Sequence, residues 1–462
     1  MRPSFKPISF ILLLALFVTT GQGCFGGSEV TELEKVKLEY WRVFDDEDAF
    51  ETIIDSYRAL HPNVSIEYRK LRFDEYEDEL IRAFAEGRGP DIFAVHNTWM
   101  REYQDLMMPM PSSVTITSQE QRGTVRREVV TVQTTNATMS MKTLKSVFVE
   151  QVPEDVILEY QPDPKIDAEE RIYGLPLALD TLALFYNKDL LNAAGIPNPA
   201  ETWSDFQDQV EALTTINSAG AITQSGAALG TADNVERSTD ILSLLMMQNG
   251  TPMVDERGRV AFNTVPDDAP EGVFPGLDAV EFYTDFANPT KAVYSWNEDY
   301  TGSFEAFANG ETAFFVGYSY HIPLIRTAAP KLNFGIAEIP QITGGREVNF
   351  ANYWIESVSA STDYEDWAWD FVLFAADEDN VGSYLAEAEK PTALRNLIST
   401  QLEDELLGPF VMQALTAEHW YKGNDYAAVE EAFGDLITAI LAGPEDPEDV
   451  IGLTARTVSQ TY

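Results

Sequence analysis

The sequence predicts an α/β fold of more than one domain, and three features of the chain support this prediction. Strand-like and helix-like segments alternate from residue 36 to residue 95, which is typical of mainly parallel sheets flanked by helices. The length of 462 residues exceeds what one hydrophobic core usually holds. A polar pair, Asp180-Thr181, separates two apolar strand-like runs, and such a break inside a core is costly unless it lies in a cleft.

The elements of the first domain follow from hydrophobic periodicity. Strands are predicted over 36–40, 64–68 and 91–95, where apolar residues alternate or run together. Between them, apolar residues recur at helical spacing over 50–60 and 73–84. Ligands of such sheets bind beyond the carboxyl ends of the strands, so the side chains that follow these strands are candidate site residues.

The stretch from Arg171 to Leu191 organises the middle of the chain. Leu175, Leu177 and Leu179 alternate as in a strand, and 182–186 is a continuous apolar run typical of a strand buried on both faces. The remaining elements are predicted as helices over 202–213, 241–247, 367–375, 429–442 and 449–458, and as strands over 312–316, 334–339 and 355–360.

The segment 107–165 departs from this alternation and is interpreted as an insertion. It is rich in Thr, Val, Ser and Pro, and 121–145 carries five basic residues against one acidic residue, Glu128. A basic island in an otherwise acidic chain is compatible with two interpretations, a surface hairpin or a docking element for a partner.

Composition excludes several classes of function. The formal net charge is −44, from 31 Lys and Arg against 75 Asp and Glu, which disfavours nucleic acid, anionic membrane and polyanionic ligands. The four histidines, His61, His96, His321 and His419, lie far apart in the sequence, and no metal or phosphate-binding motif is present. We therefore expect no metal, no cofactor and no catalytic residues.

The N-terminus predicts export. Basic residues at Arg2 and Lys6 precede an apolar run over 8–18, as in a signal peptide. The single cysteine, Cys24, follows directly, where bacterial lipoproteins are cleaved and lipidated. The sequence thus predicts a signal peptide over 1–24, a tether over 25–35 and lipid on Cys24, with simple secretion as the alternative.

The run Tyr173-Gly174-Leu175-Pro176, then Asp180, then 185–191 (FYNKDLL), resembles the first crossover of the extracellular sugar-binding proteins of ABC importers, the family of the maltose-binding protein. The resemblance implies a two-lobed periplasmic-binding-protein-like fold (type II), with lobes over 29–178 plus 357–405 and over 179–356 plus 406–462. It further implies hinges at Ala178 and Ser357.

The same resemblance implies a monomer on the outer face of the cytoplasmic membrane that binds a sugar between its lobes and delivers it to the permease subunits of the importer. A sugar ring offers an apolar face and a rim of hydroxyls, so its receptor needs aromatic platforms with carboxylate, amide and guanidinium partners. The residues expected to bind it are Asp180, Trp41, His96, Asn97, Trp99, Trp296, Tyr318, Tyr320, Asn352, Tyr353, Trp354 and Arg395.

Alternatives stay open at this point. Any single aromatic residue in this set could equally pack in a core, and Asp180 could serve as a structural cap at the crossover. The same fold could bind a peptide or a polyamine, which the negative charge would tolerate. With 75 acidic residues, a catalytic carboxylate pair of an extracellular glycan-acting enzyme is a further alternative.

If Cys24 carries lipid, Cys24→Ser should move the protein from the membrane fraction to the soluble fraction. Stable anchoring requires more than one acyl chain, so loss of the acceptor thiol should abolish it. Cell fractionation followed by immunoblotting measures this. An unchanged membrane fraction for Cys24→Ser would contradict the prediction.

Overall fold

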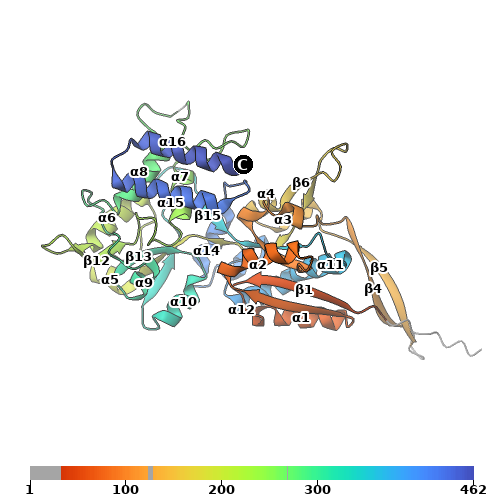
Figure 1. Cartoon of the computed structure of the whole chain (residues 1–462). Helices are drawn as coiled ribbons and strands as arrows, with labels where there is room; N and C mark the ends of the chain where they lie inside the picture. Colours follow the sequence, from red (N-terminus) through yellow and green to blue (C-terminus); the bar gives the residue numbers. More distant parts are fainter. Residues whose placement is uncertain (1–32, 123–127, 268) are drawn as a thin grey trace, which may run out of the picture. The chain divides into compact units, whose positions relative to one another are not determined.

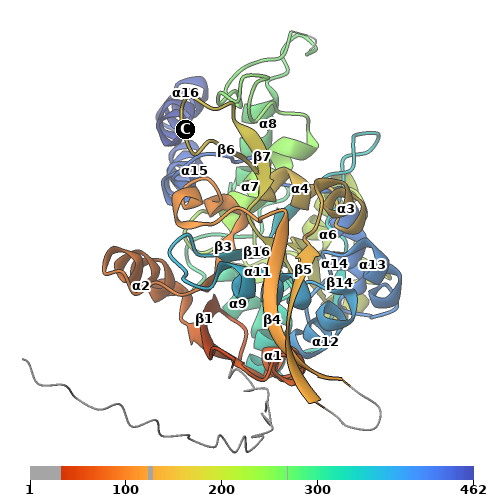
Figure 2. The same cartoon turned by 90° about the vertical axis from the view of Figure 1, so that its right-hand side faces the viewer.

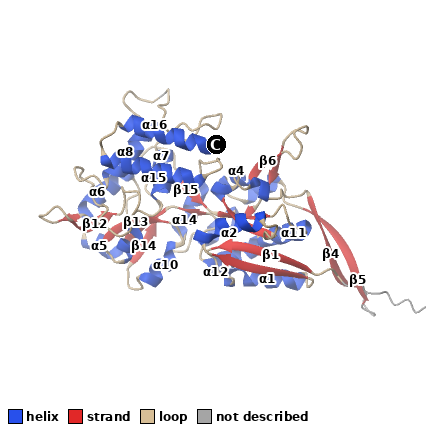
Figure 3. Cartoon of the chain, in the orientation of Figure 1, coloured by secondary structure: helices blue, strands red, loops and turns tan. Residues whose placement is uncertain are grey.

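The computed structural model describes residues 33–122, 128–267 and 269–462 (Figure 1). Residues 34–116 together with 133–462 form one compact unit, and the outer part of a hairpin, 117–132, belongs to a separate one. Within the larger unit, helices flank two five-stranded sheets (Figure 3). No helix in the described part of the chain is both long and apolar enough to cross a membrane.

The first sheet has the order β2-β1-β3-β16-β8. Its strands are β1 (Val36–Val43), β2 (Val64–Leu71), β3 (Ile92–His96), β8 (Leu175–Pro176) and β16 (Trp354–Val358). β1 runs parallel to both β2 and β3. β16 runs antiparallel to β3, beside which it lies in Figure 2, and to β8.

The second sheet has the order β11-β12-β13-β10-β14. Its strands are β10 (Ala183–Asn187), β11 (Thr215–Ile216), β12 (Ile222–Ala227), β13 (Thr312–Gly317) and β14 (Phe334–Ala337). Only β12 and β13 pair in parallel. The α/β class is confirmed, but the expected mainly parallel sheets are mixed ones, because strands that enter after a crossing, such as β10 and β16, run against their neighbours.

Seven of the helices named below follow the predicted apolar periodicity, and the others are not among the helices predicted above. Those around the first sheet are α1 (Asp48–Leu60), α2 (Phe73–Ala85), α3 (Met141–Val147), α4 (Gln151–Val156), α11 (Glu365–Ala375), α12 (Glu378–Ala388) and α13 (Arg395–Gln401). Those around the second are α5 (Lys188–Ala193), α6 (Trp203–Leu213), α7 (Ser238–Gln248), α8 (Pro275–Asp285), α9 (Ser303–Ala308), α10 (His321–Ala328), α14 (Gly408–Gln413), α15 (Tyr426–Ala442) and α16 (Pro447–Val458). Almost every residue of α7 is buried, which explains its nearly continuous apolar sequence.

The hydrophobic cores are discontinuous in sequence. The first core draws on 36–179 and 351–417, the second on 182–350 and 420–458, and a small third core joins β10 and β13 to Phe410. The predicted lobe boundaries stay a prediction. The predicted boundary at residue 356 falls inside β16, and all of this strand pairs within the first sheet.

A third, short sheet links the segments that cross between the cores. It has the order β17-β15-β9, where β9 is Asp180–Thr181, β15 is Asn349–Asn352 and β17 is Ala417–Glu418. Asn352 pairs with Asp180, and Ala351 with Thr181. This sheet fixes the position of Asp180 between the two main cores.

Parts of the segment 107–165 pack into the first core, and other parts lie at the surface. β4 (Ser113–Arg122) and β5 (Glu128–Ala137) form a two-stranded sheet, and β6 (Ile157–Tyr160) pairs with β7 (Glu169–Ile172). By contrast, Leu144 on α3 and the nearby Phe148 are fully buried in the first core. The outer hairpin and the exposed residues 161–165 therefore fit the expectation of a surface insertion, whereas α3 and Phe148 do not.

Replacing 117–132 with a short Asn-Gly turn should leave the melting temperature nearly unchanged, because this part does not belong to the larger compact unit. Deleting 115–145 should instead unfold or strongly destabilise the protein, since it removes the buried Leu144 and Ile116. Thermal melts followed by circular dichroism compare the two. A short-turn variant that melts as poorly as the long deletion would contradict this division.

Candidate ligand-binding site

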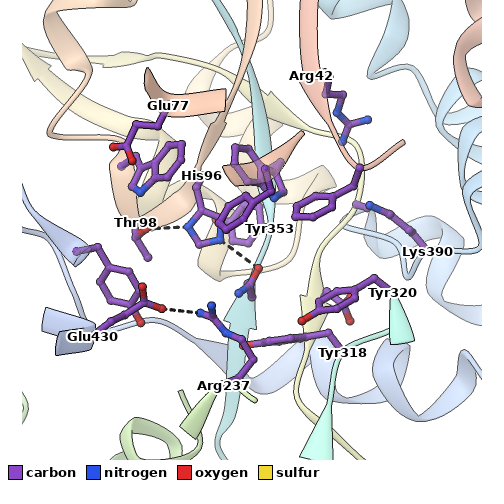
Figure 4. Close-up of a pocket in the computed structure, with 18 of the residues that line it drawn as sticks. Arg42, Glu77, His96, Thr98, Arg237, Tyr318, Tyr320, Tyr353, Lys390 and Glu430 are labelled. Atoms are coloured by element: carbon purple, nitrogen blue, oxygen red, sulfur yellow. Dashed lines mark hydrogen bonds and ion pairs between the residues drawn. The ribbon is translucent and has the colours of Figure 1, made fainter. Parts of the chain in front are cut away.

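A cavity of about 430 Å³ lies where side chains from both main cores meet, within the range of natural ligand pockets. Figure 4 shows side chains that line it. Most of the residues expected to bind a ligand are among the lining residues: His96, Trp99, Asp180, Tyr318, Tyr320, Asn352, Tyr353 and Trp354. Ala178, an expected hinge residue, also lines it.

Strand ends and the short third sheet bring these residues together. His96 ends β3, and Trp99 follows in a 3₁₀ turn, Asn97–Trp99. Tyr318 and Tyr320 follow the end of β13 and lead into α10. Because the carboxyl ends of β3 and β13 open toward the paired β9 and β15, residues far apart in sequence reach one cavity.

Asp180 connects two of these segments. Its Oδ2 accepts hydrogen bonds from Ser319 N (2.9 Å) and Ser319 Oγ (2.6 Å), and its Oδ1 accepts one from Thr181 N (2.9 Å). Burial raises the pKa of the Asp180 carboxyl to about 6, although these hydrogen bonds and Lys390 act in the opposite direction. An ionised carboxylate offers about four lone-pair sites, so Asp180 retains acceptor capacity toward the cavity.

His96 forms a fixed polar contact on the cavity wall. Its Nδ1 lies 2.7 Å from Thr98 Oγ1, and its Nε2 lies 3.1 Å from Asn352 Oδ1. Burial lowers the pKa of His96 to about 4, so the ring is neutral at pH 7. Because the amide oxygen can only accept, Nε2 carries the proton and Nδ1 accepts from the Thr98 hydroxyl.

Aromatic rings cover much of the wall. The Trp354 ring lies edge-on to Trp99 (5.3 Å between centroids) and to His96 (5.2 Å). On the side of the second core, the Tyr318 and Tyr320 rings stack at 6.0 Å, and Tyr318 donates its hydroxyl to Asp240 at 2.7 Å. Such rings offer flat apolar surfaces of fixed orientation.

The charged lining residues fall into two groups. Arg42 and Lys390 lie on one side of the cavity in Figure 4, and both pair with Asp45, at 3.0 and 2.9 Å. Glu77 and Glu430 lie on the opposite side in that view. There, burial, Glu77 and Asp425 together raise the pKa of the Glu102 carboxyl to about 7, so this carboxyl is only partly ionised at pH 7.

Arg237 lies on the floor of the cavity in Figure 4. Its Nε donates to the buried Asp240 at 2.8 Å, and its Nη2 lies 3.1 Å from Glu430 Oε1. Asp240 also accepts a hydrogen bond from the Tyr426 hydroxyl. This network anchors the first turn of α7 and positions Tyr318.

Four expected residues do not line the cavity. Trp41 and Trp296 are buried, the former under the Arg69 guanidinium and the latter stacked on Tyr300 at 4.2 Å. Asn97 is buried beside the cavity, and its Oδ1 accepts from Tyr353 N. Arg395 donates to Phe148 O at 2.7 Å.

Two other predicted positions lie elsewhere. The expected hinge residue Ser357 is buried within β16. Cys24, the expected lipid attachment site, lies outside the described residues.

Several lining residues were missed from the sequence. These are Arg42, Phe44, Phe73, Glu77, Thr98, Glu102, Arg237, Tyr384, Lys390, Pro391, Asp425, Tyr426, Ala427 and Glu430. Phe73 was assigned to the apolar face of a helix, but its side chain is 51% exposed.

The described residues contain no group of three or more His, Cys, Asp or Glu that could hold a metal ion. The carboxylates, amides and aromatic rings at the cavity are instead suited to reversible binding of a neutral or cationic polar ligand. The two-core fold and this cavity define a solute-binding protein. In agreement, residues 44–382 match the family of bacterial extracellular solute-binding proteins, and the chain belongs to that family.

Curated relatives include the galactooligosaccharide-binding protein of Bacillus subtilis (strain 168), 21% identical over 63% of this chain and 66% of its own length. Another is the maltotriose-binding protein of Pyrococcus abyssi (strain GE5 / Orsay), 20% identical over 73% of this chain and 61% of its own length. The matches thus span somewhat less than two thirds of these relatives.

Solved structures share the fold over more of the chain. A cyclo/maltodextrin-binding protein complexed with maltotetraose gives a TM-score of 0.70 at 16% identity, covering 93% of this chain and 98% of that one. The cyclic alpha-maltosyl-1,6-maltose binding protein of Arthrobacter globiformis gives 0.69 at 20% identity, covering 92% and 98%. The two-lobed periplasmic-binding-protein-like fold is confirmed.

The raised pKa of Asp180 makes a testable prediction about stability. The folded chain holds this proton up to about pH 6, whereas the carboxyl ordinarily loses it near 3.8. The contribution of this group to stability is therefore complete below about pH 4 and is lost as the pH rises to 6. Asp180→Asn, which cannot ionise, should gain in melting temperature relative to wild type when the pH is raised from 4.5 to 7.5.

Asp255→Asn is the matched control, because hydrogen bonds from Arg259 lower the pKa of Asp255 to about 2. Asp255 titrates below both pH values, so the difference in melting temperature between Asp255→Asn and wild type should be the same at pH 4.5 and at pH 7.5. Thermal melts of the three ligand-free proteins measure this. A difference for Asp180→Asn that does not change with pH would contradict the burial of an ionisable carboxyl at this position.

Proposed function

We propose that this protein is the extracellular receptor of an ABC importer and that it binds a sugar or oligosaccharide in the cavity between its two cores. The observation that carries this proposal is the combination, in one cavity, of aromatic rings with carboxylate and amide acceptors. A sugar presents C–H faces to the former and hydroxyl donors to the latter.

Asp180 and Asn352 lie opposite each other on β9 and β15, and they would accept hydrogen bonds from the hydroxyls of the sugar. The rings of Trp99, Trp354 and Tyr320 border the cavity, and they would pack against the C–H faces of the sugar. The names of the relatives support this class of ligand, since they bind a galactooligosaccharide and maltotriose, and one structural neighbour was solved with maltotetraose.

Ligand binding is proposed to shift the protein from an open to a closed form. Ala178 lies beside the cavity and bridges to Thr392, and β16, which holds Ser357, directly follows the short crossing sheet. Bending at these positions would move one core relative to the other. The closed form would then be the one recognised by the permease subunits.

The cellular setting is also part of the proposal. The chain would be exported by its N-terminal signal, held on the outer face of the cytoplasmic membrane through lipid on Cys24, and act as a monomer. No catalytic step is proposed, since the relatives carry the names of binding proteins.

A second candidate ligand is a polyamine or a cationic peptide. Glu77, Glu102 and Asp425 border the cavity, and the negative charges of Glu77 and Asp425 contribute to the raised pKa of Glu102. A cluster of carboxylates of this kind favours a cationic ligand, so spermidine belongs in the ligand panel beside the saccharides.

Calorimetric titration of maltotetraose, mannotriose, a galactooligosaccharide and spermidine into the wild-type protein tests the function. Binding of a saccharide, with no new product on chromatography after incubation, is the expected result. Binding of spermidine alone would favour the second candidate, and release of a shorter saccharide would indicate an enzyme instead.

Asp180→Ala should weaken saccharide binding by roughly ten- to a hundredfold, because a hydrogen bond to a charged acceptor contributes about 1.5–3 kcal/mol. Asp180→Asn should have an intermediate affinity. The control is Asp205→Ala, which removes a carboxylate that accepts from the Thr202 hydroxyl at the start of α6, away from the cavity. Normal affinity in a folded Asp180→Ala protein would falsify the ligand role of Asp180.

A further inference from the structure

Three non-glycine residues in the described part of the chain have a positive φ: Phe44 (64°), Arg237 (58°) and Glu389 (49°). Phe44 and Arg237 line the cavity described above, whereas Glu389 does not line it and directly precedes the lining residue Lys390. This conformation is strained for residues with a Cβ atom, and strained residues concentrate where a ligand is held.

Two of these three conformations have a local structural explanation. Arg237 reaches the buried Asp240 and also Glu430 from its position. Glu389 ends α12 in a left-handed cap, and its carboxylate pairs with Arg326 at 2.8 Å. Phe44 differs, because its side chain makes no polar contact that could offset the strain.

The positive φ of Phe44 allows a local backbone hydrogen bond, but this hydrogen bond does not require a phenylalanine at that position. Asp45 N donates to Val43 O at 2.8 Å across Phe44, which forms a tight three-residue turn. The turn brings Asp45 back to Arg42 and Lys390. Glycine would form the same turn without strain, and asparagine with less.

The ring of Phe44 therefore needs its own explanation. It is 42% exposed, so it contributes little to a core. It stacks on Phe73 (5.4 Å, 21° between ring planes) and lies nearly parallel to Tyr320 (6.2 Å, 5°). It also meets Trp354 edge-on at 6.1 Å, so it contacts rings that pack against each of the two main cores.

We propose that Phe44 is a ligand-contacting residue, whose strained backbone presents its ring as a platform for the apolar face of a saccharide ring. This inference rests on the function proposed above and adds a specificity-determining residue to it. Phe73 and Tyr320, which also line the cavity, extend this platform through their contacts with the Phe44 ring. The class of ligand is a saccharide with an exposed C–H face at this end of the cavity.

Three variants of Phe44 test the platform. Phe44→Gly and Phe44→Asn both accept a positive φ but remove the ring, whereas Phe44→Tyr keeps the ring. We expect the first two to bind a saccharide about tenfold or more weakly than wild type and Phe44→Tyr to stay within about threefold. In the absence of ligand, Phe44→Gly should melt at the same temperature as wild type or higher, because it relieves the strain.

Glu389→Gly is the matched control, since it relieves a positive φ beside the cavity while removing only an exposed ion pair. It should keep wild-type affinity. Titrations with maltotetraose, mannotriose and a galactooligosaccharide, beside thermal melts, measure all four variants.

A folded Phe44→Gly protein with wild-type affinity would overturn the platform and leave the proposed function standing. A fall of several degrees in its ligand-free melting temperature would show that the ring stabilises the fold, which also overturns it. If none of the three saccharides binds wild type, the proposed function fails and the platform fails with it.

Discussion

The hydrogen bonds between the Asp180 carboxylate and Ser319 are the contact on which the rest of the site depends. They join β9, the first segment to cross between the cores, to the residues that follow β13. The neighbouring Gln413 completes this connection, because its buried side chain donates to Thr181 Oγ1 and Leu182 O and accepts from Ile339 N. Polar groups at a crossing cannot be left unpaired inside a protein, so this position is both rigid and polar, which suits a ligand site.

Much of the fold could be predicted from the sequence, because periodicity reports which residues share a face. The helix over 50–60 buries Phe50, Ile53 and Tyr57 as expected. The apolar run after Asp180 is the buried β10. Strand direction is not contained in such patterns, so the antiparallel placement of β10 and β16 could only be learned from the structure. Asp45 pairs with Lys390, which lies far from it in the sequence, and a contact of this kind leaves no local signal.

The site was predicted in part, and the reasons differ between residues. Asp180 was identified because it lies between two apolar runs and within the motif that resembles the family's first crossover. An aromatic residue at a strand end is ambiguous, because side chains alternate between the faces of a strand. Trp41 therefore lies in the core while Phe44, three residues later, lines the cavity. The exposure of Phe44 depends on a positive φ, and a phenylalanine in the sequence does not indicate that conformation.

The discontinuous cores also constrain the order of folding. The second core is completed by α15 and α16, which end at Val458, whereas its first strands are made near residue 183. These contacts join the middle of the chain to its end, and long-range contacts of this kind form slowly. While the chain is being synthesised, the second core must stay open until its last helices emerge. A chain that ended before α15 and α16 would therefore leave the apolar residues of the second core exposed.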